Sequence, residues 1–372
     1  MRVSSHGPLT KVLDNFGGAI GTHPGLKRSR NEDRAVFAHV TNAAGEQFSV
    51  ALLCDGVGGS EMGDVAATLV VTAFLGELAT APPGQALQKL LLDLVLATDN
   101  VVRRELSGRG ATTASIFLAS SRGEVAATNI GDSRIFSWSA GEHVFSQISR
   151  DDTLENELKD FPDMDVSALK ARGLGDSLSQ AIGETGRTAK ELQIRIFNQQ
   201  HFPTGIIMAS DGAWKMAPDG FSAVVKYAPS AVEAVKRVTT IANWAGGGDN
   251  VSIIAIQDIN NLIKASENSA RSTSKKIWIT IWYGDTKLVI CEPADPYINK
   301  FSLNKNSSPD QHSLAEKKAR RGSSERKKTK LKRNQPQLDL NITDGSGFDP
   351  KAAANKPRPK IEISIDSDSS ET

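Results

Sequence analysis

Phe48-Ser49-Val50-Ala51-Leu52-Leu53-Cys54-Asp55-Gly56-Val57-Gly58-Gly59 is a nearly continuous apolar run that ends in an aspartate and a glycine-rich turn. An apolar run of this length, bounded by turn residues, indicates a strand that is buried on both faces. Asp55 therefore lies at the end of a core strand. The glycines after it allow the backbone to turn tightly and bring a carbonyl close to a ligand.

Four further motifs place a carboxylate beside Gly or Asn, close to an apolar run. They are Arg28-x-x-Asn31-Glu32-Asp33, Gly131-Asp132-Ser133-Arg134, Ala209-Ser210-Asp211-Gly212 and Gly248-Asp249-Asn250. Carboxylates at strand ends, from distant parts of a chain, are how a fold assembles a metal site made of oxygen ligands. Such ligands suit Mg²⁺ and Mn²⁺ rather than Zn²⁺ or copper. Two such ions can hold a nucleophilic water for phosphoester hydrolysis.

The apolar patterning predicts a mixed α/β fold. Helical spacing indicates helices over Glu61–Leu78, Gln85–Leu106 and Ser230–Trp244. Short apolar runs indicate strands over Ala114–Ser120, Val125–Ile130, Arg134–Ser139, Gln193–Phe197, Ile206–Ser210 and Val251–Ile256. Strand runs mixed with paired helices favour a sandwich of two largely antiparallel sheets.

In order and spacing, the five motifs resemble those of the metal-dependent protein phosphatases of the protein phosphatase 2C type. The resemblance runs from about Gly21 to about Asp258, roughly two thirds of the chain, whereas a single Asp-Gly pair is only a turn signal. Animal members usually carry histidine where this chain has Val57, so the chain looks more like the bacterial branch. The resemblance implies an α-β-β-α sandwich of two stacked sheets flanked by helices, with metals in a cleft at one end.

The resemblance also implies two Mn²⁺ or Mg²⁺ ions and metal ligands at Glu32, Asp55, Gly56, Asp132, Asp211 and Asp249. Asp55 would bridge both ions, and Gly56 would contribute its carbonyl. Asp132 would help to hold a third, looser ion that many bacterial members carry. Simpler readings stay open: a plain Asp-Gly turn at Asp55, a solvated loop at Glu32, and a β-turn aspartate satisfied by local amides at Asp132.

Two catalytic residues follow from the same resemblance. Arg28 matches the phosphate-binding arginine, whose guanidinium fork suits phosphate oxygens, although a solvated basic turn is the alternative. Asp33 matches the neighbour that orients ligands and waters. The implied mechanism is in-line attack on phosphorus by a water activated between two metals, without a phosphoenzyme. Asp152 stands where the family usually has histidine, which puts the role of that histidine in doubt but leaves the metal ligands intact.

Charge divides the chain near Asp258. Residues 1–258 carry 23 Lys and Arg against 29 Asp and Glu, a net of −6, whereas residues 259–372 carry 21 against 14, a net of +7. We expect a catalytic domain over 1–258, a linker over 259–274 and a β-hairpin over 275–301. Residues 302–372 read as a disordered tail that is first basic and then acidic.

Cys54 and Cys291 form no disulfide framework, and no apolar run approaches the ~20 residues of a membrane span, so we expect a cytoplasmic protein. Expected partners are phosphorylated proteins and an opposing serine/threonine kinase, while the basic tail is suited to an acidic partner. Specific nucleic-acid binding is not expected, because no aromatic residues interleave with the basic run. The alternative function is a catalytically weak pseudophosphatase or a phosphoprotein-binding scaffold, which would have no need to keep four ligand carboxylates.

Overall fold

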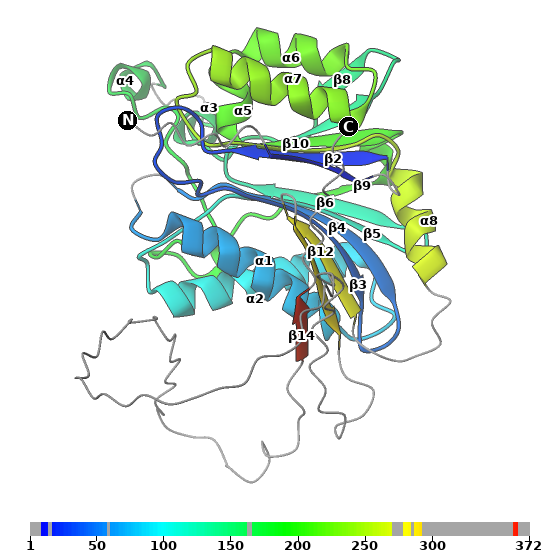
Figure 1. The fold of residues 1–372 in the computed structure, drawn as a ribbon. Helices are drawn as coiled ribbons and strands as arrows, with labels where there is room; N and C mark the ends of the chain where they lie inside the picture. The colour runs from blue at the N-terminus through cyan, green and yellow to red at the C-terminus, as the bar shows by residue number, and fades with distance from the viewer. Residues whose placement is uncertain are drawn as a thin grey trace, which may run out of the picture. The chain divides into compact units, whose positions relative to one another are not determined.

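The computed structural model describes residues 9–13, 17–57, 60–161, 166–269, 278–283, 286–291 and 360–363. Two stacked antiparallel sheets form the centre of the first compact unit, residues 1–294 and 359–372, with helices on both outer faces (Figure 1). The α-β-β-α sandwich predicted from the sequence is therefore confirmed. Residues 295–358 are assigned to a separate unit and lie outside the described residues, as does most of the expected disordered tail.

The first sheet has six strands in the spatial order β1-β2-β11-β10-β7-β8. Their bounds are β1 Leu9–Leu13, β2 Gly18–His23, β11 Val251–Ile256, β10 Gly205–Ala209, β7 Arg134–Ser139 and β8 Val144–Gln147. The second sheet has the order β14-β13-β12-β3-β4-β5-β6-β9. Its bounds are β14 Lys360–Ile363, β13 Thr286–Cys291, β12 Trp278–Tyr283, β3 Arg34–Thr41, β4 Gln47–Cys54, β5 Ala114–Ser120, β6 Val125–Ile130 and β9 Ile196–Asn198.

The helices cover the two sheets from outside (Figure 1). Helices α1 (Gly63–Ala79) and α2 (Leu87–Leu106) pack on the second sheet, and α7 (Ala231–Trp244) packs on the first, next to α6 (Pro218–Lys226). The remaining helices are α3 Leu154–Lys159, α4 Val166–Ala171, α5 Asp211–Trp214 and α8 Ile259–Ser269. Among the helices of the described segments, none is both long and apolar enough to cross a bilayer.

The surroundings of strand β4 explain why its sequence is an almost unbroken apolar run. Val50, Leu52 and Cys54 point into the core between the second sheet and α1 and α2, whereas Ala51 and Leu53 point into the core between the two sheets. Because both faces of the strand are covered, the apolar residues do not alternate with polar ones. The thiol of Cys54 is buried, as the sequence suggested.

The linker predicted over 259–274 is wrong in its first part, where α8 occupies Ile259–Ser269. Ile259 and Leu262 are fully buried in the core between the sheets, and the Ser49 hydroxyl donates a hydrogen bond to the Leu262 carbonyl at 3.1 Å. Two apolar residues at helical spacing are sufficient here because β4 and β5 provide the surface that buries them.

Strands β12 and β13 form a hairpin within the predicted range, and this hairpin is joined to the first compact unit. Strand β12 pairs antiparallel with β3 along six residues, so the hairpin extends the second sheet (Figure 1). Ile279 is buried against the core that α1 and α2 cover. Since an isolated hairpin is marginally stable in water, this pairing accounts for its position in the fold.

Strand register brings the acidic motifs to one edge of the sandwich, the one formed by the ends of strands from both sheets. The last residue of β10 pairs with the first residue of β7, and the first residue of β11 pairs with the last residue of β2. In the second sheet, the last residue of β4 pairs with the first residue of β3. The loops that carry the motifs all leave the strands at this edge.

Candidate functional site

Asp55 is fixed by the neighbouring strand. Its backbone N–H donates to the Thr113 hydroxyl at 3.0 Å, and its carbonyl accepts from the Thr112 hydroxyl at 2.8 Å. A Cβ atom at Gly56 would lie 2.7 Å from the Gly63 backbone carbon and 3.0 Å from the Glu32 Cβ, so the space admits only glycine. The structure thus brings Gly56 and Glu32 together, as the proposed ligand set requires.

Asn250 holds the loop that carries Glu32. Its side-chain oxygen accepts from the Glu32 backbone N–H at 2.8 Å, while its amide group donates to the carbonyls of Pro24 and Arg30 at 2.9 and 2.8 Å. Because Asp249 precedes Asn250, the same contacts connect the Glu32 loop to the Asp249 loop.

Asp33 is fully buried and links the two sheets. The Ser210 hydroxyl donates to its Oδ2 at 3.0 Å, and Ser210 in turn accepts from the backbone N–H of Ser252 at 2.9 Å. The other oxygen, Oδ1, is buried and has no hydrogen-bond partner within the described part of the chain. Burial raises the pKa of Asp33 to about 7, with Asp211 raising it further and the serine hydroxyls opposing the shift.

Asp211 and Asp249 meet where β10 passes into α5. A Cβ atom at Gly212 would lie 3.1 Å from the Asp249 Cβ, which places the start of α5 against the Asp249 loop. The Arg28 guanidinium donates from Nη2 to Asp249 Oδ2 at 2.8 Å, and both side chains remain partly exposed. Arg28 therefore lies beside the carboxylates, at the solvent side of the edge.

Asp132 stands on the turn between β6 and β7. Burial raises the pKa of its carboxyl group to about 7, Asp211 adds to the shift, and Lys215 opposes it. The neighbouring Arg134 is occupied elsewhere: it forms two-point contacts with Asp151 and stacks over the Trp214 ring at 3.2 Å. That arrangement gives Arg134 a structural role.

Asp152 is almost completely buried and holds the Asp132 turn. Its Oδ2 accepts from the Gly131 backbone N–H at 3.0 Å and from Gln180 Nε2 at 2.7 Å, and its Oδ1 accepts from Arg195 Nη1 at 3.0 Å. Its own N–H donates to the Gly131 carbonyl at 3.0 Å. In this chain an aspartate and an arginine thus support the turn.

The carboxylates repel one another across the edge. Burial raises the pKa of Asp55 well above its usual range, and Asp33, Asp211, Asp132 and Asp249 raise it further, in that order. Burial also raises the pKa of Asp211, with Asp249 next in effect. All predicted acidic ligands except Glu32 thus act on Asp55, and Glu32 lies beside Gly56.

Divalent cations fit this edge. The proposed ligand atoms are all oxygens, and Asp33 Oδ1 lacks a hydrogen-bond partner among the residues that the structure describes. A cation would also relieve the repulsion that raises the carboxyl pKa values. Within the described ranges, no three His, Cys, Asp or Glu side chains are close enough to form a ready-made ion site. Asp33, Asp211, Asp132 and Asp249 nevertheless all raise the pKa of Asp55, so they lie near enough to interact with it electrostatically.

Sequence reasoning missed several residues around the site. Thr113, Ser210 and Ser252 position the carboxylates, and short hydroxyl side chains give no motif that would reveal this. Lys215 lies 3.8 Å from Asp211 and 3.3 Å from Asp176. Its spacing of four residues from Asp211 on a helix is the one signal that could have identified it.

Comparisons with known proteins agree with this geometry. The family model of protein phosphatase 2C matches residues 21–244. The serine/threonine phosphatase stp of Listeria monocytogenes is 25% identical over 249 residues, which cover 63% of this chain and 93% of the relative. The serine/threonine protein phosphatase PstP of Mycobacterium tuberculosis is 27% identical over 236 residues, which cover 62% of this chain and 42% of the relative.

Solved structures show the same fold. The crystal structure of the M. tuberculosis serine/threonine phosphatase PstP/Ppp has a TM-score of 0.51 at 23% identity and covers 64% of this chain and 96% of that chain. That of the serine/threonine phosphatase Stp1 from Staphylococcus aureus has a TM-score of 0.53 at 19% identity, with 68% and 98% covered. Since the family model spans more than half of the sequence, the chain belongs to the protein phosphatase 2C family.

Proposed function

We propose that the protein is a metal-dependent serine/threonine protein phosphatase that hydrolyses phosphoserine and phosphothreonine in proteins. The observation that carries the proposal is the convergence of five sequence motifs at one edge, where Asp33, Asp132, Asp211 and Asp249 all act on Asp55. The relatives named as serine/threonine phosphatases support the substrate class. A serine/threonine kinase in the same compartment would supply the phosphorylated proteins. The absence of a disulfide framework in the sequence suggests that this compartment is the cytoplasm.

The proposed metal ligands are Glu32, Asp55, the Gly56 carbonyl, Asp211 and Asp249 for two ions, with Asp132 and Asp211 for a third. Mn²⁺ or Mg²⁺ bound there would supply positive charge for the phosphoryl oxygens and would activate water as the nucleophile. Asp33 orients this set from its buried position, through Ser210 and through the Oδ1 atom that has no partner among the described residues.

Arg28 is the proposed phosphate ligand. A guanidinium group carries five N–H donors, so the contact of Nη2 with Asp249 leaves further donors for phosphate oxygens. The position of Arg28 between Asp249 and solvent suits a residue that receives the substrate at the entrance of the site. Its partial exposure also means that the ion pair with Asp249 is inexpensive to rearrange.

Variants of the three central aspartates test the proposal. In Mn²⁺, Asp55→Asn, Asp211→Asn and Asp249→Asn should each lower phosphate release from a phosphothreonine peptide by about 100-fold or more, because a ligand carboxylate is lost. Asp219→Asn, an exposed aspartate on α6, is the matched control and should keep wild-type turnover. A wild-type protein that binds the phosphopeptide without releasing phosphate would favour the scaffold alternative. Full activity in any two of the three variants would refute the ligand assignment.

A further inference from the structure

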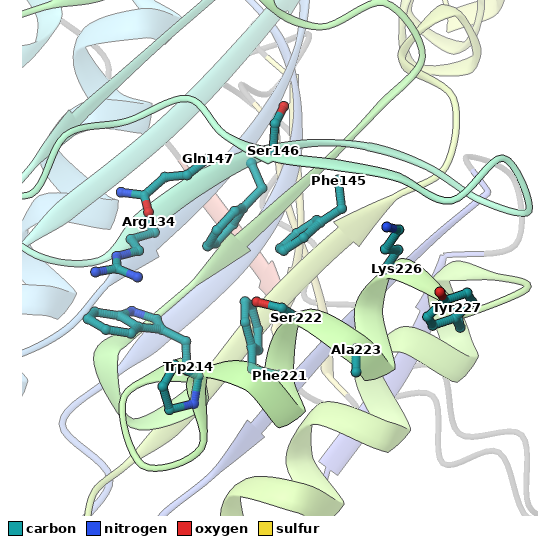
Figure 2. Close-up of a pocket in the computed structure, with 12 residues that line it drawn as sticks. Arg134, Phe145, Ser146, Gln147, Trp214, Phe221, Ser222, Ala223, Lys226 and Tyr227 are labelled. Atoms are coloured by element: carbon teal, nitrogen blue, oxygen red, sulfur yellow. The ribbon is translucent and has the colours of Figure 1, made fainter.

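A pocket of about 550 Å³ opens between the β7–β8 hairpin and α6 (Figure 2). Its apolar lining includes three phenylalanines, of which Phe136 and Phe221 are almost fully buried and Phe145 is partly exposed. The rings of Phe136 and Phe145 are stacked with centroids 4.6 Å apart, and the Phe221 ring lies 5.4 Å from Phe136 and 5.9 Å from Phe145. This volume is in the range of pockets that hold small ligands, and it suffices for one large side chain and its neighbours.

The lining of the pocket is cationic. Its twelve residues include Arg134 and Lys226 but no Asp or Glu. Arg134 is neutralised by Asp151 at 2.7 Å, whereas the exposed Lys226 ammonium has no carboxylate partner in the described segments and lies 5.9 Å from the Tyr227 ring centroid. In a catalytic region with a net charge of −6, this is a place where an acidic segment is attracted rather than repelled.

The pocket shares a wall with the catalytic edge. Arg134 follows Asp132 by two residues and stacks over Trp214, which Figure 2 shows at one end of the pocket. Trp214 closes the short helix α5 that begins at Asp211. One helical turn therefore separates the pocket from a proposed metal ligand, and a peptide in the pocket needs few residues to reach the site.

The rim extends the apolar surface. Tyr227, which follows Lys226 in the lining, is 58% exposed. The His143 ring lies 4.8 Å from the Tyr227 ring, which holds the hairpin against the end of α6. A peptide can thus place an apolar side chain on the phenylalanines and a carboxylate at Lys226.

We propose that this aromatic pocket docks an acidic segment of the phosphoprotein substrate that carries a large apolar side chain. The inference rests on the proposed phosphatase function, and it adds a second point of substrate recognition outside the metal site. The apolar side chain gives affinity by burial against the accessible rings of the lining, Phe145 and Tyr227, while Lys226 selects the neighbouring carboxylate.

Two phosphothreonine peptides with the same core test the proposal, one extended by Phe-Glu-Glu and the other by Ser-Gly-Gly. For the wild-type protein, kcat/KM should be higher by about tenfold for the Phe-Glu-Glu peptide, which corresponds to one well-buried side chain with a charge contact. Lys226→Glu and Phe145→Ala should each abolish the preference. Lys236→Glu, the same charge change at an exposed position on α7, should preserve it.

A fluorescently labelled, unphosphorylated Phe-Glu-Glu peptide provides a readout without turnover, and its polarisation should show weaker binding to Lys226→Glu than to Lys236→Glu. Hydrolysis of p-nitrophenyl phosphate should be equal in all variants, which also shows that they are folded. Equal turnover of both peptides by the wild type, or equal effects of Lys226→Glu and Lys236→Glu, would overturn the docking site. Failure of the wild type to hydrolyse p-nitrophenyl phosphate would contradict the proposed function instead, and the labelled peptide would still test the pocket.

Discussion

Replacing Asp152 by alanine removes the acceptor that holds the Asp132 turn. Three donors lose their partner: the Gly131 backbone N–H, Gln180 Nε2 and Arg195 Nη1. Gln180 keeps its second contact, to the Gln193 carbonyl at 3.0 Å. The buried Gly131 N–H has no other acceptor in the described part of the chain, so the turn is expected to shift and to carry Asp132 with it.

The size of the effect follows from burial. An unsatisfied buried N–H costs about 1–3 kcal/mol. The Arg195 side chain is 37% exposed, so water replaces part of the lost ion pair and we count about 1 kcal/mol for it. Burial raises the pKa of Asp152, which shows that the charged carboxylate carries a desolvation cost that alanine avoids. The net loss in the free energy of unfolding is therefore about 2–3 kcal/mol.

Asp152→Asn should lose less, about 1 kcal/mol, because the amide oxygen still accepts from Gly131 and Gln180 while its NH₂ group faces the partly solvated Arg195. Urea unfolding measures these losses of stability. Titration of activity with Mn²⁺ shows whether the turn that carries Asp132 has shifted. The half-saturating Mn²⁺ concentration should rise most for Asp152→Ala and less for Asp152→Asn.

Asp99→Ala is the matched control. Asp99 is also buried, accepts from the Gly183 backbone N–H at 2.9 Å and pairs with Arg187 at 3.1 Å. It should lose comparable stability but leave the Mn²⁺ titration unchanged, since no contact of Asp99 involves a proposed metal ligand. A Mn²⁺ titration of Asp152→Ala that matches Asp99→Ala would refute the idea that Asp152 positions the Asp132 turn.

Three further outcomes are expected. Arg28→Ala should raise KM for phosphopeptides by about tenfold, the loss of a charge-assisted contact of about 1.5 kcal/mol. The change in Mn²⁺ affinity should be smaller, although Arg28 also pairs with Asp249. A shift in Mn²⁺ affinity at constant KM would make Arg28 structural. Without metal, the pKa of about 7 at Asp33 and Asp132 lies above the pKa that these carboxyl groups have in the unfolded chain. Their protonated forms therefore stabilise the folded protein in EDTA, and this stability is lost as pH rises through 7. Urea midpoints should therefore fall from pH 6 to pH 8 without metal and not with Mn²⁺, and a flat metal-free profile would contradict those shifts. Truncation after residue 301 should preserve turnover of p-nitrophenyl phosphate. Truncation after residue 269 removes β12, which pairs with β3, so the exposed β3 should cause association that light scattering detects. A monomeric, stable 1–269 chain would show that β3 needs no cover.

Much of the sandwich could be predicted because local signals agree with the tertiary structure. The strands over Ala114–Ser120, Val125–Ile130 and Arg134–Ser139 are confirmed with the predicted bounds. Gly123 and Gly131 lie at the turns between them with φ of 85° and 99°, a region that glycine enters without strain. Apolar runs and turn glycines together define both the strands and their order along the chain.

The parts that failed depend on distant contacts. Helix α8 carries Ile259, Leu262 and Ile263 at helical spacing, but the stretch around them is polar, and only the core between the sheets explains their burial. The contact of Arg195 with Asp152 joins residues 43 positions apart, and the pairing of Arg28 with Asp249 joins residues 221 positions apart. The motifs identified the acidic residues of the site, whereas the hydroxyl and basic groups around them became apparent only in the folded chain.

Phosphate release from a phosphothreonine peptide, before and after metal removal, tests the central claim most directly. The protein is stripped with EDTA, dialysed and assayed as Mn²⁺ is added back, with wild type and Asp55→Asn in parallel. We predict no turnover by the stripped wild type, full recovery in Mn²⁺, and no recovery by Asp55→Asn, because its proposed bridging carboxylate is gone. Full turnover by the stripped wild-type protein would contradict a metal-dependent mechanism at this edge.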